Sequence, residues 1–267
     1  MRVQVLVASM HQTDSSLVEK MNLSTDAVIG NQCDRCSNEE YLFGDKKIVY
    51  LNRTERGVGL NRNATLLNSN GDILTFADDD MVFVDGYEDI IKKAFEEIPK
   101  ADAIIFNIKT IGTDVGRRSN SKIKRVRWFN ALNYGAARIS VKANKIKREN
   151  VLFHTCFGGG TMYSSGEDSI FITDMLKRKL RLYVYPVCIA SVDQTTSTWF
   201  NGYTDKYFHD KGALFCAISK RWAKLLCLQD AIRHNGVYKK SVGKVYKQMK
   251  RGIKAFKNLE KFDDKEN

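Results

Sequence analysis

The chain has 267 residues, a formal net charge of +12 and a hydrophobic content of 43%. This apolar content is typical of folded globular proteins and excludes a disordered chain. The length is enough to bury a sizeable core and suits one domain with an appendage. No stretch of about 18 apolar residues occurs, so we expect no membrane-spanning helix. The apolar start, residues 1–9, lacks a cleavage-type end and predicts a first strand, not a signal peptide.

Strand-like runs and helical patterns alternate along most of the chain. The runs typical of strands occupy residues 2–9, 26–30, 47–51, 72–77, 103–106 and 180–187. The helical patterns occupy residues 60–69, 86–97, 140–147 and 168–179, followed by 206–228 and 238–262. Such alternation predicts an α/β unit with a mainly parallel sheet. Ligands of such sheets gather beyond the carboxyl ends of the strands, which is where we expect the site.

Three adjacent carboxylates follow the strand at 72–77. Asp78, Asp79 and Asp80 would repel one another by roughly 4 kcal/mol per pair near a protein surface unless a cation is present. In an extended backbone, Asp78 and Asp80 point to one side and Asp79 to the other. This geometry suits Asp78 and Asp80 to a hard divalent ion that is completed by waters and substrate phosphates. The alternative is an acidic turn that caps the next helix.

Three motifs in this order resemble those of the family 2 glycosyltransferases. They are Gly59-Leu60-Asn61-Arg62-Asn63, the run from Gly71-Asp72 to Asp78-Asp79-Asp80, and Gly166-Glu167-Asp168 ahead of a helix. The resemblance implies the GT-A fold, a Rossmann-like α/β fold with a mainly parallel central sheet flanked by helices. It implies a nucleotide-sugar transferase domain at residues 1–204 and a C-terminal helical extension at 205–267. The stretch from 197 to 215 is similar to bacterial capsule and surface-polysaccharide enzymes.

The resemblance also implies the chemistry. The enzyme would move a sugar, with inversion, from a nucleotide-sugar to a glycan hydroxyl, and a UDP-sugar is the favoured donor. Asp78 and Asp80 are implied to bind Mn²⁺ or Mg²⁺, which neutralises charge on the leaving diphosphate. Asp168 is implied as the general base, with Glu167 as the fallback. The structural alternative is that Glu167 and Asp168 merely cap the helix at 168–179.

Contacts to the nucleotide-sugar are expected at the strand ends and around the second motif. The expected residues are Ser9, Asn31, Asp34, Arg56, Arg62, Asp78 and Asp79. The first two strands end in Ala8-Ser9-Met10-His11 and Gly30-Asn31-Gln32-Cys33-Asp34, which differ from the segments common in the family. The contacts to the nucleobase therefore stay open.

Positive charge is concentrated near the C-terminus. Residues 239–262 contain nine Lys or Arg against Glu260, with apolar residues at a spacing of three to four between them. This is the pattern of a basic amphipathic helix, and we expect it to dock on an anionic membrane surface without insertion. Docking would agree with a polyprenyl-diphosphate-linked acceptor and with a cytoplasmic enzyme held peripherally at the inner face of the cell membrane. The alternative is a helix packed on the catalytic domain with its lysines in solvent.

Two further interpretations remain open. The basic chain with an Arg-rich loop at 117–127 could be a nucleic-acid-binding protein. That function gives the three carboxylates no role, and we expect no nucleic-acid partner. A nucleotidyltransferase or a retaining transferase of related architecture would share the metal but form a different product. The six cysteines include the pair Cys33 and Cys36 without a second pair, so we expect reduced thiols instead of a zinc site.

Overall fold

The computed structural model describes residues 1–112, 119–193 and 202–266, with the side chains of 260–266 left undescribed. The expected basic loop therefore lies partly outside the described residues, as does the segment 197–200 of the family resemblance. Among the described residues, no helix is long and apolar enough to cross a membrane.

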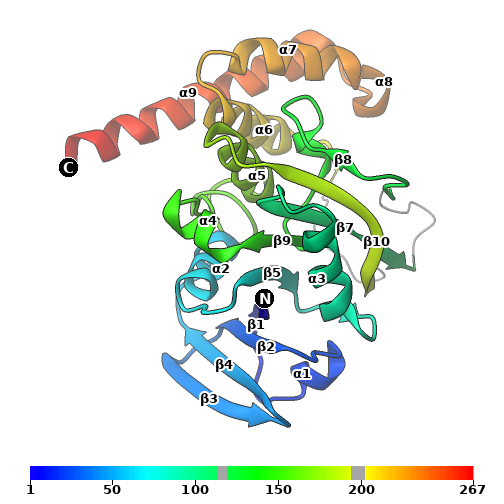
Figure 1. The fold of residues 1–267 in the computed structure, drawn as a ribbon. Coiled ribbons are helices and arrows are strands. Elements are labelled where there is room, and N and C mark those ends of the chain that lie inside the picture. Colours follow the sequence, from blue (N-terminus) through cyan, green and yellow to red (C-terminus); the bar gives the residue numbers. More distant parts are fainter. Residues whose placement is uncertain (113–118, 194–201, 267) are drawn as a thin grey trace.

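The strands form one sheet in the order β3-β4-β2-β1-β5-β9-β7-β10-β6, with β8 paired to β10 (Figure 1). Their bounds are β1 Val3–Met10, β2 Asp26–Gln32, β3 Ser37–Phe43, β4 Lys46–Arg53, β5 Ile73–Asp78, β6 Met81–Phe83, β7 Ala103–Ile111, β8 Lys124–Arg125, β9 Ile139–Lys142 and β10 Leu182–Asp193. The strands β4, β2, β1 and β5 run parallel, and so do β7 and β10. Strand β9 lies antiparallel between β5 and β7. The expected mainly parallel α/β sheet is confirmed.

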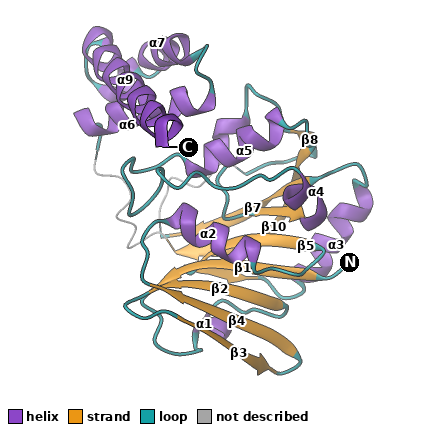
Figure 2. Cartoon of the chain, turned by 90° about the vertical axis from the view of Figure 1, so that its left-hand side faces the viewer, coloured by secondary structure: helices purple, strands orange, loops and turns teal. Residues whose placement is uncertain are grey.

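Helices cover both faces of the sheet (Figure 2). Their bounds are α1 Leu17–Lys20, α2 Val58–Leu67, α3 Tyr87–Glu97, α4 Ala143–Arg148, α5 Glu167–Lys177, α6 Asp205–Ile218, α7 Ala223–Arg233, α8 Asn235–Tyr238 and α9 Val242–Glu266, with a 3-10 turn η1 at Ala131–Asn133. In β1, Val5 and Val7 pack into the cluster with α1 and α3, whereas Leu6 packs into the cluster with α2, α4 and α5. This alternation is the period of two of a strand buried on both faces.

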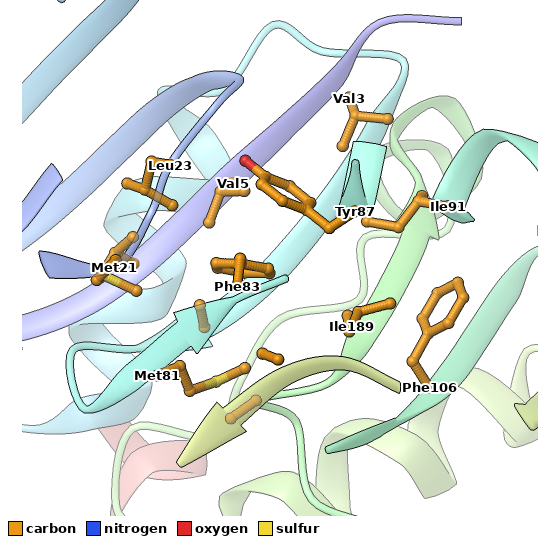
Figure 3. Close-up of a cluster of buried hydrophobic side chains, with 14 of the residues drawn as sticks. Val3, Val5, Met21, Leu23, Met81, Phe83, Tyr87, Ile91, Phe106 and Ile189 are labelled. Atoms are coloured by element: carbon orange, nitrogen blue, oxygen red, sulfur yellow. The ribbon is translucent and has the colours of Figure 1, made fainter. Parts of the chain in front are cut away.

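The core on the α1 and α3 side contains large side chains from distant parts of the chain. Phe83 and Tyr87 lie together with ring centroids 4.3 Å apart, and Met21 and Ile189 belong to the same buried cluster (Figure 3). The Tyr87 hydroxyl is satisfied by Thr25 at 2.7 Å. This packing fixes the segment that follows β5, and with it the turn that carries the acidic residues.

The C-terminal helices form a third apolar cluster. The apolar stripe of α9, including Met249, Ile253 and Phe256, is buried against α6 and α7. The two helices approach closely because glycines face the contact: a Cβ at Gly252 would overlap the His209 carbonyl, and one at Gly212 would overlap Met249. The amphipathic helix expected at 238–262 is thus present, and its apolar face is a packed part of the protein. The division of the chain at 204/205 stays a prediction.

One local expectation was wrong. The helix expected near 140–147 begins at Ala143, because residues 139–142 instead form strand β9 between β5 and β7. The helical stretch expected at 206–228 is present as two helices, α6 and α7, separated at 219–222. The edge strand β3, which pairs antiparallel with β4, was not predicted.

Candidate active site

The acidic run lies at the carboxyl end of two neighbouring parallel strands. Ala8 in β1 is opposite Asp78, the last residue of β5, and the chain then turns at Asp79 and Asp80. Asp78 and Asp80 line a cavity of about 370 Å³. Asp79 instead faces the end of β1, where its Oδ2 accepts a hydrogen bond from the Met10 amide at 3.4 Å, and burial raises its pKa. The three carboxylates are thus divided between two surroundings.

Arg62 joins the two acidic motifs, one close to it in the sequence and the other 105 and 106 positions further on. Its guanidinium donates to Asp78 Oδ1 and to Asp168 Oδ1, each at 2.7 Å, and contacts Glu167 Oε1 at 3.3 Å. The side chain is 4% exposed and packs over the Phe153 ring, with 5.3 Å from Cζ to the centroid. Burial alone would lower the pKa of Arg62, but the carboxylate charges outweigh burial and raise it. Arg62 is therefore a permanent cation shared by three acids.

The rest of the Gly-x-x-Arg-Asn motif positions that arginine. Asn61 donates to the Gly30 carbonyl at 2.8 Å, and a Cβ at Gly30 would overlap the Asn61 side chain. Asn63 makes a pair of hydrogen bonds with the backbone of Phe153, both at 2.8 Å. The two asparagines therefore tie α2 to the sheet on one side and to the segment at 153 on the other. Arg62 lies between them and is directed at the cavity.

The second acidic motif occupies the first turn of α5. Gly166 has a φ of 123°, a conformation that favours glycine, and both Glu167 and Asp168 line the cavity. Acidic side chains in the first turn are stabilised by the helix dipole. Burial and the Asp168 charge raise the pKa of Glu167 to about 7, against the opposing charge of Arg62. A Cβ at Gly135 would come within 3.0 Å of Asp168 Oδ2, so this carboxylate has backbone close beside it.

The two acids of α5 differ in access. The Asp168 side chain is 28% exposed, whereas that of Glu167 is 8% exposed. A group that takes a proton from a bound hydroxyl must be reachable from the cavity. The geometry therefore favours Asp168 over Glu167 as the proton acceptor, and it gives Glu167 a role in holding Arg62.

The residues expected on the nucleotide side lie around the ends of β1 and β2. The Ser9 hydroxyl donates to the Gly30 carbonyl at 3.2 Å, and Asn31 bonds to Gln12 and Asn52. Both are buried and hold the strand ends together.

Asp34 and Arg56 form a pair at 2.7 Å outside the 370 Å³ cavity, with Asp34 91% exposed. The structure therefore brings Arg62, Asp78, Asp80, Glu167 and Asp168 together, and it leaves Ser9, Asn31, Asp34, Arg56 and Asp79 off the lining of that cavity.

Sequence reasoning missed part of the cavity wall. The additional lining residues come from β6, β7, β10, α5, α6 and the segments before α5 and β9, namely Met81, Ile108, Tyr134, Ala137, Ser165, Ser169, Val192 and Leu214. Gly166, which the third motif includes, also lines this wall. The other residues carry no pattern that distinguishes them from core.

The oxygen donors at the cavity determine whether a divalent metal fits the site. No group of three or more His, Cys, Asp and Glu side chains suited to a metal occurs among the described residues. Mg²⁺ and Mn²⁺ do not require such a group, since one or two carboxylates with waters and substrate phosphates suffice. Asp80 is exposed on the cavity wall, and Asp78 shares its carboxylate with Arg62. These residues fit a metal that is held largely by the substrate, with Asp80 as the chief protein ligand.

The fold, the acidic end of β5 and the acidic first turn of α5 define a GT-A glycosyltransferase. A model of glycosyl transferase family 2 matches residues 24–165, just over half of the chain. The chain belongs to this family and is a glycosyltransferase. No curated protein matches the chain. This membership decides between the enzyme and the nucleic-acid-binding protein in favour of the enzyme.

Solved structures of S. aureus TarS share the fold. TarS 1-349 in complex with UDP-GlcNAc matches with a TM-score of 0.63 and 10% identity, over 97% of this chain and 92% of that one. The complex with UDP matches with a TM-score of 0.60 and 11% identity over the same shares. A further TarS structure has a TM-score of 0.61 and 12% identity, over 94% of this chain and 55% of that one.

Proposed function

We propose that the protein is an inverting, metal-dependent glycosyltransferase that moves a sugar from a UDP-sugar to a hydroxyl of a lipid-linked or growing surface glycan. The observation that carries this proposal is the Arg62 network, which places Asp78 and Asp168 at one cavity beside Asp80. The complexes of TarS with UDP-GlcNAc and UDP support a uridine donor.

Asp168 takes the proton in the proposed reaction. The acceptor oxygen forms a bond to the anomeric carbon while the bond from that carbon to the diphosphate oxygen breaks, and the acceptor proton passes to Asp168. UDP leaves with the electron pair of the broken bond, so attack from the opposite face inverts the anomeric centre. Arg62 holds Asp168 by a hydrogen bond of 2.7 Å, which orients the carboxylate for this step.

A divalent ion completes the site in this proposal. Asp80 and the part of Asp78 not engaged by Arg62 would hold Mn²⁺ or Mg²⁺. When bound, the ion supplies charge neutralisation for the leaving diphosphate. Asp79, with its raised pKa, and the strand-end residues Ser9 and Asn31 shape the neighbouring wall on the nucleotide side.

The acceptor and its location form the finer part of the proposal. The exposed lysines of α9 carry a positive surface, and residues 239–262 would hold the enzyme electrostatically at an anionic membrane from the cytoplasmic side. Insertion of α9 is not part of this proposal, because its apolar face is packed on α6 and α7.

The test compares Asp168→Asn with Glu167→Gln, two substitutions that keep volume and remove a carboxylate. Asp168→Asn should lower turnover by at least about 100-fold while UDP binding, measured by calorimetry with Mn²⁺, changes little. Glu167→Gln should keep most of the turnover. Full turnover in Asp168→Asn would refute the base assignment. A product with the donor's anomeric configuration, determined by NMR, would refute inversion.

A further inference from the structure

A described segment outside the catalytic network displays large apolar side chains to solvent. In residues 122–132, Phe129 is 84% exposed, Trp128 51%, Ile123 45% and Leu132 43%. Exposed apolar groups that gather in one segment mark an interaction surface more often than singly scattered ones do. We call residues 122–132 the aromatic loop.

The aromatic loop is held in place at several points. Asn120, which lies just before the loop, makes three hydrogen bonds of 2.9–3.1 Å with Asn107 in β7. Strand β8 pairs with β10 at the edge of the sheet (Figure 1), and the Asn130 side chain accepts from the Arg127 amide at 2.8 Å. Val126, between these supports, is buried. The loop is thus anchored, and its Trp128 and Phe129 side chains stay exposed to solvent beside their described neighbours.

The charge of the loop is of one sign. Residues 121–133 contain no acidic residue, whereas Lys122, Lys124, Arg125 and Arg127 are all exposed. None of the four forms an ion pair within the described part of the chain. Each basic residue near an anionic leaflet adds roughly fivefold to membrane affinity. Aromatic rings flanked by unpaired cations suit the boundary between lipid headgroups and acyl chains.

We propose that the aromatic loop docks on an anionic lipid bilayer, with Trp128 and Phe129 inserted at the headgroup boundary and the four cations against the lipid phosphates. A sugar-binding platform is the rival, but the exposed apolar side chains of Ile123 and Leu132 have no role in it. The loop leads through η1 to Tyr134 and Ala137, which line the catalytic cavity. Docking would therefore bring the cavity to a membrane-embedded acceptor, and in this respect the inference rests on the proposed function.

The test is co-sedimentation of the full chain with phosphatidylglycerol/phosphatidylcholine vesicles. The Trp128→Ala/Phe129→Ala variant leaves the charge unchanged and should bind at least tenfold more weakly. The matched control is Leu42→Ala/Phe43→Ala on the exposed edge strand β3, which should bind as the unaltered chain does. Replacing the four cations of the loop by Gln should also reduce binding tenfold or more, and pure phosphatidylcholine should bind weakly in every case.

Unchanged vesicle binding of the Trp128/Phe129 variant would overturn the inference, as would an equal loss in the β3 control. A raised KM for a lipid-free oligosaccharide acceptor with unchanged vesicle binding would assign the loop to the glycan instead. UDP binding is measured separately by calorimetry with Mn²⁺. If UDP fails to bind while vesicle binding still depends on Trp128 and Phe129, the proposed function fails and the membrane contact stands.

Discussion

The carboxyl group of Glu167 should make the protein less stable as the pH rises through neutrality. Its pKa in the folded protein is raised from 4.5 to about 7 by burial and by Asp168. A group with a raised folded-state pKa gives its full stabilisation below the unfolded pKa and loses it as the pH passes the folded one. The difference of about 2.5 pH units, at about 1.4 kcal/mol per unit, amounts to about 3 kcal/mol lost between pH 4.5 and pH 7–8.

Glu167→Gln tests this argument because glutamine has a similar shape and does not titrate. We expect the variant to gain up to about 3 kcal/mol over the unaltered chain on going from pH 5 to pH 8. The assay is urea unfolding followed by circular dichroism in metal-free buffer across this range, with Asp168→Asn as the companion variant. A stability difference between Glu167→Gln and the unaltered chain that stays constant with pH would refute the reasoning.

Three further changes probe other parts of the structure. Arg62→Met should destabilise the protein by about 3–5 kcal/mol at pH 8 because it leaves buried carboxylates without their cation. The loss of stability, measured by urea unfolding, should be smaller at pH 5. An equal loss of stability at both pH values would contradict the role of Arg62 as a shared cation. Gly252→Ala should lower stability by about 1–3 kcal/mol or more because its Cβ would overlap the His209 carbonyl. The control Gly243→Ala lies on the same helix with open space around it and should be neutral or slightly stabilising. Similar thermal midpoints of unfolding for the two variants would argue against the close crossing of α6 and α9. Replacing the exposed lysines of α9 by Gln should weaken salt-sensitive retention on phosphatidylglycerol vesicles without lowering the midpoint of unfolding. Unchanged retention would remove the docking role of α9. The lysines are Lys244, Lys247, Lys250, Lys254 and Lys257.

The sheet and its acidic strand end could be predicted from the sequence because they depend on local patterns. A run of β-branched and aliphatic residues before Asp78 requires no knowledge of the rest of the chain. The contact of Arg62 with Glu167 and Asp168 could not be predicted in this way, since it joins residues 105 and 106 positions apart. From its position alone, Arg62 suited a phosphate or a base as well as an acid.

The errors have the same origin. Residues 139–142 alternate apolar and polar side chains, the period of a strand, but four residues are too few to separate from the helical pattern that follows them. Their pairing between β5 and β7 decides the structure, and that pairing depends on distant parts of the chain. The apolar stripe of α9 was predicted correctly, yet a periodic pattern does not say which surface covers it. The glycines at 212 and 252 indicate the surface that covers the stripe, because they permit α6 and α9 to pack closely.

The charge at the cavity explains why a cation belongs in the proposed reaction. When all groups are ionised, one guanidinium faces Asp78, Glu167 and Asp168, and Asp80 adds a further negative charge on the same wall. A sugar diphosphate entering this corner brings more negative charge, and like charges about 4 Å apart repel by roughly 4 kcal/mol near a protein surface. The raised pKa of Glu167 relieves part of this excess through a retained proton, but a proton on Glu167 does nothing for the diphosphate itself. A divalent ion at Asp80 would neutralise both partners, while Arg62 holds Asp168 in place for the acceptor.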